Sequence, residues 1–267
     1  MHKRISTRDI TIAPIDLEAG KLLGPPVSFT QGFVEGARGS SWSPDGKCLA
    51  YAVTCNNGCV AIRAVATGQV RLLAPTMSNV NAPMWSPDGR SLLTAGRDRG
   101  NRQGIFQIDV QSGEAMAVIL REGNDDIGGP PQWSPDGKKV YYARRSGAVV
   151  ERDLASGSER DVHREAGLRS IGLAPDGQHF FAVARLDPAT QTASLLVVPA
   201  AGGQPRELLR LAMAEGFRPG PFQWTPDSSA LIAIKNTGSR RELWLVSVAA
   251  GPPRKLEIDP DIWLEGS

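Results

Sequence analysis

The stretch Trp42-Ser43-Pro44-Asp45-Gly46 is the first of five copies of one short phrase. The copies are Trp42–Gly46, Trp85–Gly89, Trp133–Gly137, Leu173–Gly177 and Trp224–Ser228. Successive aspartates of the phrase are 43, 48, 40 and 51 residues apart. A phrase that returns with a period of about 45 residues is typical of a repeat architecture built from small, similar units.

The chemistry of the phrase is that of a tight turn. Serine favours the first position of a type I turn, proline presets φ at the second, and glycine suits the fourth. A turn of this kind joins two antiparallel strands in a hairpin. We therefore predict structural turn roles, and not catalytic ones, for Pro44, Asp45, Gly46, Pro87, Asp88, Gly89, Pro135, Asp136, Gly137, Pro175, Asp176, Gly177, Pro226 and Asp227.

A second turn phrase lies between the copies of the first. It ends in glycine at Gly20, Gly68, Gly113 and Gly157, with weaker forms at Gly202 and Gly251. The flanking segments alternate in apolar character, as in 47–53 and 138–143, which is the pattern of strands. Each unit thus holds four strands and two tight turns, which predicts the blade of a β-propeller.

The Trp-Ser-Pro-Asp-Gly repeat resembles the WD40-like repeat of TolB-type β-propellers, and similar blades occur in prolyl oligopeptidase-like peptidases. The resemblance covers nearly the whole chain and implies an all-β, single-domain propeller of four-stranded antiparallel blades. Two copies depart from the pattern, since Leu173-Ala174 replaces Trp-Ser and Ser228 replaces glycine. Because positive φ is uncommon outside glycine, Ser228 predicts an altered or strained fifth turn.

The repeat spacing also predicts the limits of the blades. We expect a half blade at 9–30, complete blades at about 39–73, 82–120, 129–163, 168–210 and 221–257, and the start of a closing blade at 261–267. A closing blade shared by the two chain ends makes six, and it lacks a strand. We therefore expect the chain to be a piece of a longer protein, with six or seven blades in the parent.

Composition excludes several classes of protein. The 267 residues include 30 basic and 28 acidic side chains, so no strongly basic face for nucleic acid is expected. The chain contains no apolar run long enough for a membrane span. Its first residues lack the apolar segment of a secretory signal. We expect a monomeric domain, and the sequence leaves its compartment open.

The irregular loops are the predicted binding surface. In a propeller blade they lie on the face opposite the repeated turns, and binding usually occurs on variable loops held by a rigid scaffold. Solvated loop residues without a ligand are the alternative. The candidates near the mouth of the channel are Arg38, Asn81, Asp125, Asp126, Arg169, Phe217 and Arg218.

Cys55 and Cys59 flank Asn56-Asn57-Gly58, the sequence of a hairpin turn. Such a turn can bring two thiols within bridging distance, so we predict that these cysteines can form a disulfide. A disulfide implies an oxidising compartment. With Cys48 on a separate strand and no histidine nearby in sequence, no zinc site and no cofactor are predicted.

Catalytic motifs are missing from the sequence. It contains no Gly-x-Ser-x-Gly nucleophile elbow and no phosphate-binding glycine loop. The three histidines, His2, His163 and His179, are not expected to share one site. These observations favour a non-catalytic module that binds a protein or peptide. Two alternatives stay open: the gating propeller of a larger peptidase, and the sensor domain of a bacterial regulator or kinase.

Overall fold

The computed structural model describes residues 10–29, 37–55, 58–121, 127–177, 179–199, 203–215, 217–237, 240–249 and 251–258. All regular structure in these residues is β-strand, apart from one short 3-10 helix, η1 (Met213–Glu215). The chain divides into two compact units. Unit 1 contains Met1–Ile12, Pro26–Trp133 and Ser267, and unit 2 contains Ala13–Pro25 and Ser134–Gly266.

Five four-stranded antiparallel sheets follow one another along the chain, each with its strands in sequential order. The first two consist of β5 (Ala37–Trp42), β6 (Cys48–Val53), β7 (Cys59–Ala64) and β8 (Val70–Leu73), and of β9 (Ser78–Trp85), β10 (Ser91–Arg97), β11 (Gln103–Asp109) and β12 (Ala115–Arg121). The third consists of β13 (Ile127–Trp133), β14 (Lys139–Arg144), β15 (Ala148–Asp153) and β16 (Glu159–Arg164). The last two consist of β17 (Leu168–Gly172), β18 (His179–Asp187), β19 (Thr192–Pro199) and β20 (Arg206–Ala212), and of β21 (Phe217–Trp224), β22 (Ala230–Thr237), β23 (Arg240–Ser247) and β24 (Arg254–Lys255).

The expectation of six blades was wrong: the described residues form five complete four-stranded sheets. The N-terminal segment forms only two-stranded pairings, in which β1 (Thr11–Ile12) pairs with β4 (Val27–Ser28) and β2 (Ile15–Asp16) with β3 (Lys21–Leu22). Each complete sheet contains one turn of the repeated phrase between its first two strands, with Ser228 in place of glycine in the fifth, and the segment before β5 has no such turn. The predicted start of a closing blade, 261–267, lies outside the described residues.

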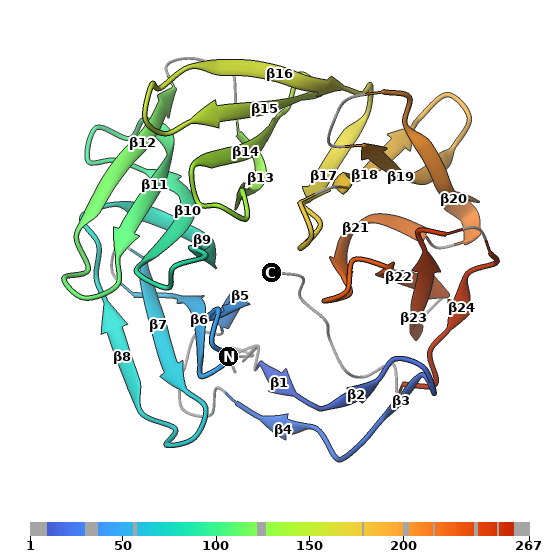
Figure 1. The fold of residues 1–267 in the computed structure, drawn as a ribbon, viewed down its shortest axis with the longest axis horizontal. Coiled ribbons are helices and arrows are strands. Elements are labelled where there is room, and N and C mark those ends of the chain that lie inside the picture. Colours follow the sequence, from blue (N-terminus) through green and yellow to red (C-terminus); the bar gives the residue numbers. More distant parts are fainter. Residues whose placement is uncertain are drawn as a thin grey trace, which may run out of the picture. The chain divides into compact units, whose positions relative to one another are not determined.

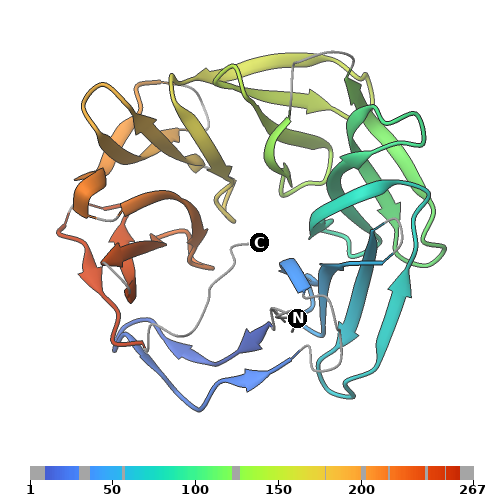
Figure 2. The same cartoon turned by 180° about the vertical axis from the view of Figure 1, so that it is seen from behind.

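The cores lie between neighbouring sheets. In unit 1, where β5 and β9 lie side by side (Figure 1), Ala50 and Val60 of the first sheet pack with Leu92 and Phe106 of the second. In unit 2, side chains of β19 and of β21–β23 form a second cluster around Trp224 and Leu231, on strands that can be followed from behind in Figure 2. Burial is nearly continuous along inner strands such as β6 and β15, so both faces of these strands are covered.

Candidate functional site

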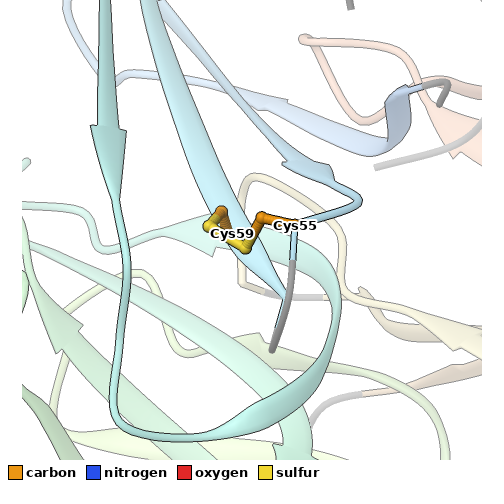
Figure 3. The surroundings of a disulfide bond; sticks show 2 residues. All are labelled: Cys55 and Cys59. Atoms are coloured by element: carbon orange, nitrogen blue, oxygen red, sulfur yellow. A yellow bond between two sulfur atoms is a disulfide. The ribbon is translucent and has the colours of Figure 1, made fainter. Parts of the chain in front are cut away.

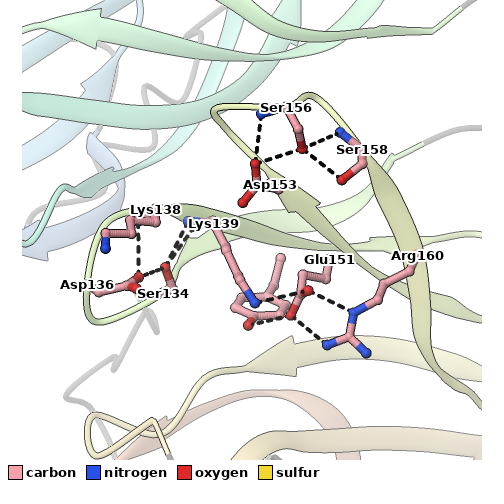
Figure 4. Close-up of polar contacts among 10 residues, drawn as sticks. Ser134, Asp136, Lys138, Lys139, Glu151, Asp153, Ser156, Ser158 and Arg160 are labelled. Atoms are coloured by element: carbon pink, nitrogen blue, oxygen red, sulfur yellow. Dashed lines mark hydrogen bonds and ion pairs between the residues drawn. The ribbon is translucent and has the colours of Figure 1, made fainter.

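The Pro-Asp-Gly turns are closed by a repeated set of hydrogen bonds. In the third copy, Ser134 Oγ donates to Asp136 Oδ1 at 2.5 Å, the Lys138 amide donates to Asp136 Oδ1 at 3.0 Å, and the Lys139 amide donates to Ser134 Oγ at 2.9 Å (Figure 4). The corresponding hydroxyl–carboxylate bonds are Ser43–Asp45 at 2.7 Å, Ser86–Asp88 at 2.6 Å and Thr225–Asp227 at 2.6 Å. The phrase thus satisfies its own polar groups.

The two kinds of turn lie at the same end of each sheet. Backbone bonds link them directly, as from Val65 N–H to Lys47 O and from Leu154 N–H to Lys138 O, at 2.9 and 3.0 Å. The second and fifth sheets repeat this link from Val110 to Arg90 and from Val248 to Ser229. This end of the sheets is therefore closed by backbone hydrogen bonds.

The turn aspartates Asp45, Asp88, Asp136 and Asp227 remain ionised at neutral pH. The Ser43, Ser86 and Ser134 hydroxyls lower the pKa of the aspartate in the same turn, with further help from backbone amides. In the fifth copy the Thr225 hydroxyl, followed by Ser229, lowers the pKa of Asp227 to about 2. Because a general acid needs a pKa near the working pH, these carboxylates are suited to holding turns and not to donating protons.

The fifth turn keeps its backbone shape despite the loss of glycine. Ser228 has φ of 59°, close to the 69° and 70° of Gly46 and Gly89. Its hydroxyl oxygen accepts a hydrogen bond from the Asp176 amide at 3.0 Å. This contact with the neighbouring turn gives the serine a favourable interaction that offsets part of the cost of positive φ.

The described loop-face candidates lie on the first strands of their sheets, four of them within the first two residues of the strand and Asn81 midway along β9. Arg38 is in β5, Asn81 in β9, Arg169 in β17, and Phe217 and Arg218 begin β21. The Asn81 and Arg169 side chains are exposed. For Arg38, Phe217 and Arg218 only the backbone position is described. Asp125 and Asp126 lie outside the described residues.

A close backbone contact holds the starts of β5 and β9 together in unit 1. A Cβ atom placed on Gly39 would lie 2.5 Å from Ala82 Cα, and both residues have positive φ, 49° and 43°. Ser41 Oγ donates to Pro83 O at 2.8 Å and accepts from Trp85 N–H at 3.1 Å. Arg38 and Asn81 therefore lie on strands whose relative position is tightly constrained.

A disulfide lies at the same end of the first sheet. The Cys55 and Cys59 sulfurs are bonded, and their Cα atoms are 5.7 Å apart (Figure 3). A Cβ atom on Gly58 would lie 3.2 Å from the Val80 amide nitrogen, so the bridged turn packs against β9 one residue before Asn81. The bridge stiffens a turn that borders the predicted binding surface.

An ion-pair chain joins the third and fourth sheets within unit 2. His163 Nε2 lies 3.5 Å from Glu165 Oε2, whose other oxygen lies 3.0 Å from Arg185 Nη1. Arg185 lies 3.7 Å from Glu207, which Arg210 contacts at 2.7 Å. The sequence analysis missed this chain because its members come from separate strands and match no motif.

Glu151 is a buried acidic group, and its carboxylate is fully engaged by hydrogen bonds and an ion pair with neighbouring side chains. It accepts hydrogen bonds from Tyr141 Oη at 2.9 Å and Arg160 Nε at 2.8 Å, and Lys139 Nζ lies at 3.2 Å (Figure 4). Burial opposes its charge, but these donors outweigh burial and lower the pKa of Glu151. Burial and Glu151 together raise the pKa of Tyr141. This cluster stabilises β14–β16 and offers no proton at neutral pH.

Catalytic and metal-binding groups do not converge in the described part of the chain. There, no three histidine, cysteine, aspartate or glutamate side chains are placed to hold a metal ion. His163 contacts Glu165, His179 is described by its backbone in β18 only, and His2 lies outside the described residues. The described helical structure, η1, is far too short to cross a membrane.

Solved structures of propellers are similar to this chain. TolB from Acinetobacter baumannii is 18% identical, with a TM-score of 0.70 over 86% of this chain and 58% of that one. A protein of Agrobacterium tumefaciens provisionally identified as TolB is 18% identical, with a TM-score of 0.69 over 89% of this chain and 90% of that one. An oligogalacturonate lyase of Vibrio parahaemolyticus is 16% identical, with a TM-score of 0.58 over 82% and 65%. At these identities the likeness concerns the fold.

Two curated relatives are also similar in sequence. The uncharacterized protein Atu1656 of Agrobacterium fabrum is 27% identical over 212 residues, which are 72% of this chain and 68% of that protein. The uncharacterized peptidase YuxL of Bacillus subtilis is 26% identical over 152 residues, but only 22% of the peptidase is covered. A sequence model described as the TolB beta propeller domain matches residues 39–261. With five four-stranded antiparallel sheets and this match over most of its length, the chain belongs to the TolB beta propeller domain family.

Proposed function

We propose that this chain is a non-catalytic binding module that engages a protein or peptide partner at the ends of its blades opposite the Pro-Asp-Gly turns. The observation that carries the proposal is that polar groups at the turn end are hydrogen-bonded to one another, whereas polar side chains away from the turns are exposed. At the turn end, the serine hydroxyls, aspartate carboxylates and backbone amides bond one another. Away from these turns, the Asn81 side chain midway along β9 and the Arg169 side chain at the start of β17 are exposed.

The family supports this function. TolB-like propeller domains often mediate protein interactions. An exposed amide or guanidinium group on a strand of a packed sheet can recognise a partner without the loss of conformational entropy that ordering a loop would cost.

The test compares substitutions at the two ends. A partner captured from an extract of the source organism is purified, and its Kd is measured for Asn81→Ala, Arg169→Ala, and the turn-end controls Lys47→Ala and Lys138→Ala. We expect at least one loop-end substitution to weaken binding by about tenfold, since a well-placed interface side chain contributes more than about 1 kcal/mol. The controls should change Kd less than about twofold. Weakening by the turn-end substitutions alone would contradict the proposal.

A second candidate function rests on the similarity to the Bacillus subtilis peptidase. If the chain is the gating propeller of a larger peptidase, the partner is a hydrolase domain and the loop end selects peptides by size. Substitution of Asn81 or Arg169 would then change the length of peptide that the associated hydrolase cleaves. Binding of a separate protein without any effect on peptide hydrolysis would exclude this candidate.

We further propose that the module works in an oxidising compartment, because structural disulfides persist mainly there. Protein prepared from its native compartment, denatured without reductant and treated with a thiol reagent, should show one reactive cysteine, Cys48, and all three after reduction. Three reactive thiols before reduction would exclude the proposal.

A further inference from the structure

A small apolar pocket lies in unit 2 between the outer strand of the fourth sheet and the fifth sheet. Its walls are Leu209 and Leu211 of β20, Lys235 of β22, Trp244 of β23, and Pro253 just before β24. Its volume is about 170 Å³. All five residues are partly exposed, so the pocket is open to solvent and is separate from the loop-end residues discussed above.

The aromatic wall of the pocket is fixed at its polar edge. Trp244 Nε1 donates to Glu242 Oε2 at 3.0 Å, and Lys255 Nζ donates to Glu242 Oε1 at 2.5 Å. The hydrogen bond from Lys255 lowers the pKa of Glu242, so this carboxylate stays ionised. Its negative charge is balanced by the neighbouring Lys255 ammonium. The indole ring is thereby held in one orientation, with its face available as a wall of the pocket.

Lys235 is the charged residue among the five that line the pocket. Its Nζ lies 5.3 Å from the centroid of the Trp244 ring, within the range of a cation–π contact. Lys235 lies opposite Glu242 in the β22–β23 register and its charge helps to lower the pKa of that carboxylate, but the Glu242 oxygens are hydrogen-bonded to Lys255 and Trp244. Among the described residues, no carboxylate lies within ion-pair distance of Lys235. A positive charge at the edge of an apolar pocket is complementary to a ligand that carries a carboxylate beside an apolar group.

The size of the pocket limits what it can hold. It is smaller than the 300–1,000 Å³ or so that is common for cavities binding drug-sized molecules. It is close to the roughly 150 Å³ of an apolar cavity that accepts benzene. We infer that this pocket binds one aromatic or branched aliphatic side chain of a peptide, with a neighbouring carboxylate of that peptide paired to Lys235.

The test uses N-acetyl-L-phenylalanine and its carboxamide, which share the ring and differ in the charge. Each is titrated into ¹⁵N-tryptophan-labelled protein, and the indole N–H signals of the six tryptophans are followed. A Trp244→Phe variant identifies the Trp244 signal. We expect the acid to shift this signal with a Kd in the millimolar range, about two- to fivefold tighter than the amide, which is the usual strength of a partly exposed ion pair.

Substitutions of Lys235 separate the charge from the pocket shape. Lys235→Met keeps the aliphatic stem and should reduce the affinity for the acid to that for the amide, whereas Lys235→Arg should retain the preference. Lys138→Met, which removes an exposed lysine at a turn of the same unit, should leave both titrations unchanged. Absence of any Trp244 shift by the acid up to about 20 mM, equal affinities for acid and amide, or a preference that survives Lys235→Met would each overturn the inference.

Discussion

The hydroxyl and the carboxylate of the repeated phrase act as one unit. Ser43, Ser86, Ser134 and Thr225 each donate to the aspartate two residues later, while the same oxygen accepts an amide five residues on. In the fourth copy Ala174 replaces the hydroxyl-bearing residue. Any aspartate held by such donors favours the charged form in the folded state, which makes turn stability dependent on pH.

Asp227 provides the pH test. Its pKa is lowered from 3.8 to about 2 in the folded protein, so its contribution to stability is complete above the unfolded pKa and is lost as pH falls toward 2. Asp227→Asn should therefore make the fall in the free energy of unfolding between about pH 4 and pH 2 shallower than in the wild type. Urea unfolding at several pH values in this range measures the slope.

Thr225→Val is the matched control for this prediction. It keeps the carboxylate and removes the hydroxyl that contributes most to its low pKa. The pKa of Asp227, followed by NMR of its carboxyl carbon, should rise toward 3.8 in this variant. An unchanged pKa would show that the hydroxyl is not the cause.

Neighbouring sheets are linked by the tryptophans of the phrase. Trp133 Nε1 donates to Met84 O at 3.3 Å, and Trp224 Nε1 donates to Gly172 O at 2.9 Å. In both cases the indole reaches the first strand of the preceding sheet. Trp42 belongs to the first complete sheet and remains 46% exposed, whereas Trp224 is 5% exposed. The tryptophan of the phrase is therefore buried to different extents in different sheets, and its contribution to stability depends on the sheet that packs against it.

Replacing Trp224 should lower the free energy of unfolding more than replacing Trp42. Trp224→Ala empties a packed site and should lower the free energy of unfolding by about 3–5 kcal/mol. Trp42→Ala should cost about 1–2 kcal/mol, because nearly half of its side chain is already in water. Denaturant unfolding of both variants provides the comparison, and equal losses would contradict this explanation of the exposure difference.

The whole molecule joins parts of the chain that are far apart in sequence. In unit 2, Ile15 and Leu22 of the N-terminal hairpin pack against Leu256 near the other end of the described chain. The Glu257 amide donates to Gly20 O at 2.7 Å, and Lys21 Nζ lies 3.1 Å from Glu257. The hairpin thus completes the apolar face of the fifth sheet.

Hydrogen exchange tests this role of the hairpin. In an Ile15→Asn, Leu22→Asn double variant, the Glu257 amide should exchange about 10- to 100-fold faster, since its bond to Gly20 depends on the packed hairpin. Amides of Leu92 and Ile105 in unit 1 should keep their protection. Val27→Asn, which changes an exposed residue of β4 in unit 1, outside the β2–β3 hairpin, should leave Glu257 unaffected. Unchanged exchange of Glu257 in the double variant would refute the proposed support.

Much of the architecture was predictable from local chemistry. The turn phrase predicted the hairpins, and apolar alternation predicted the strands, because both depend on residues within about five positions of one another. The loss of glycine predicted an altered or strained fifth turn, whereas Ser228 keeps a φ close to that of the glycines and forms a bond with the Asp176 amide that the sequence did not indicate. Of the loop-end candidates, Asn81 midway along β9 and Arg169 at the start of β17 are exposed, and their role in binding stays a prediction.

By itself, the sequence determined the repeat unit, the type of blade and the family, because turn and strand preferences act between near neighbours. Only the tertiary structure decided the number of complete sheets, the ion-pair chain through Glu165 and Arg185, and the pocket beside Trp244. Those features join residues that are 20 or more positions apart, such as Leu211 and Trp244. The energy of such contacts depends on how sheets pack, and packing leaves no periodic signal in the chain.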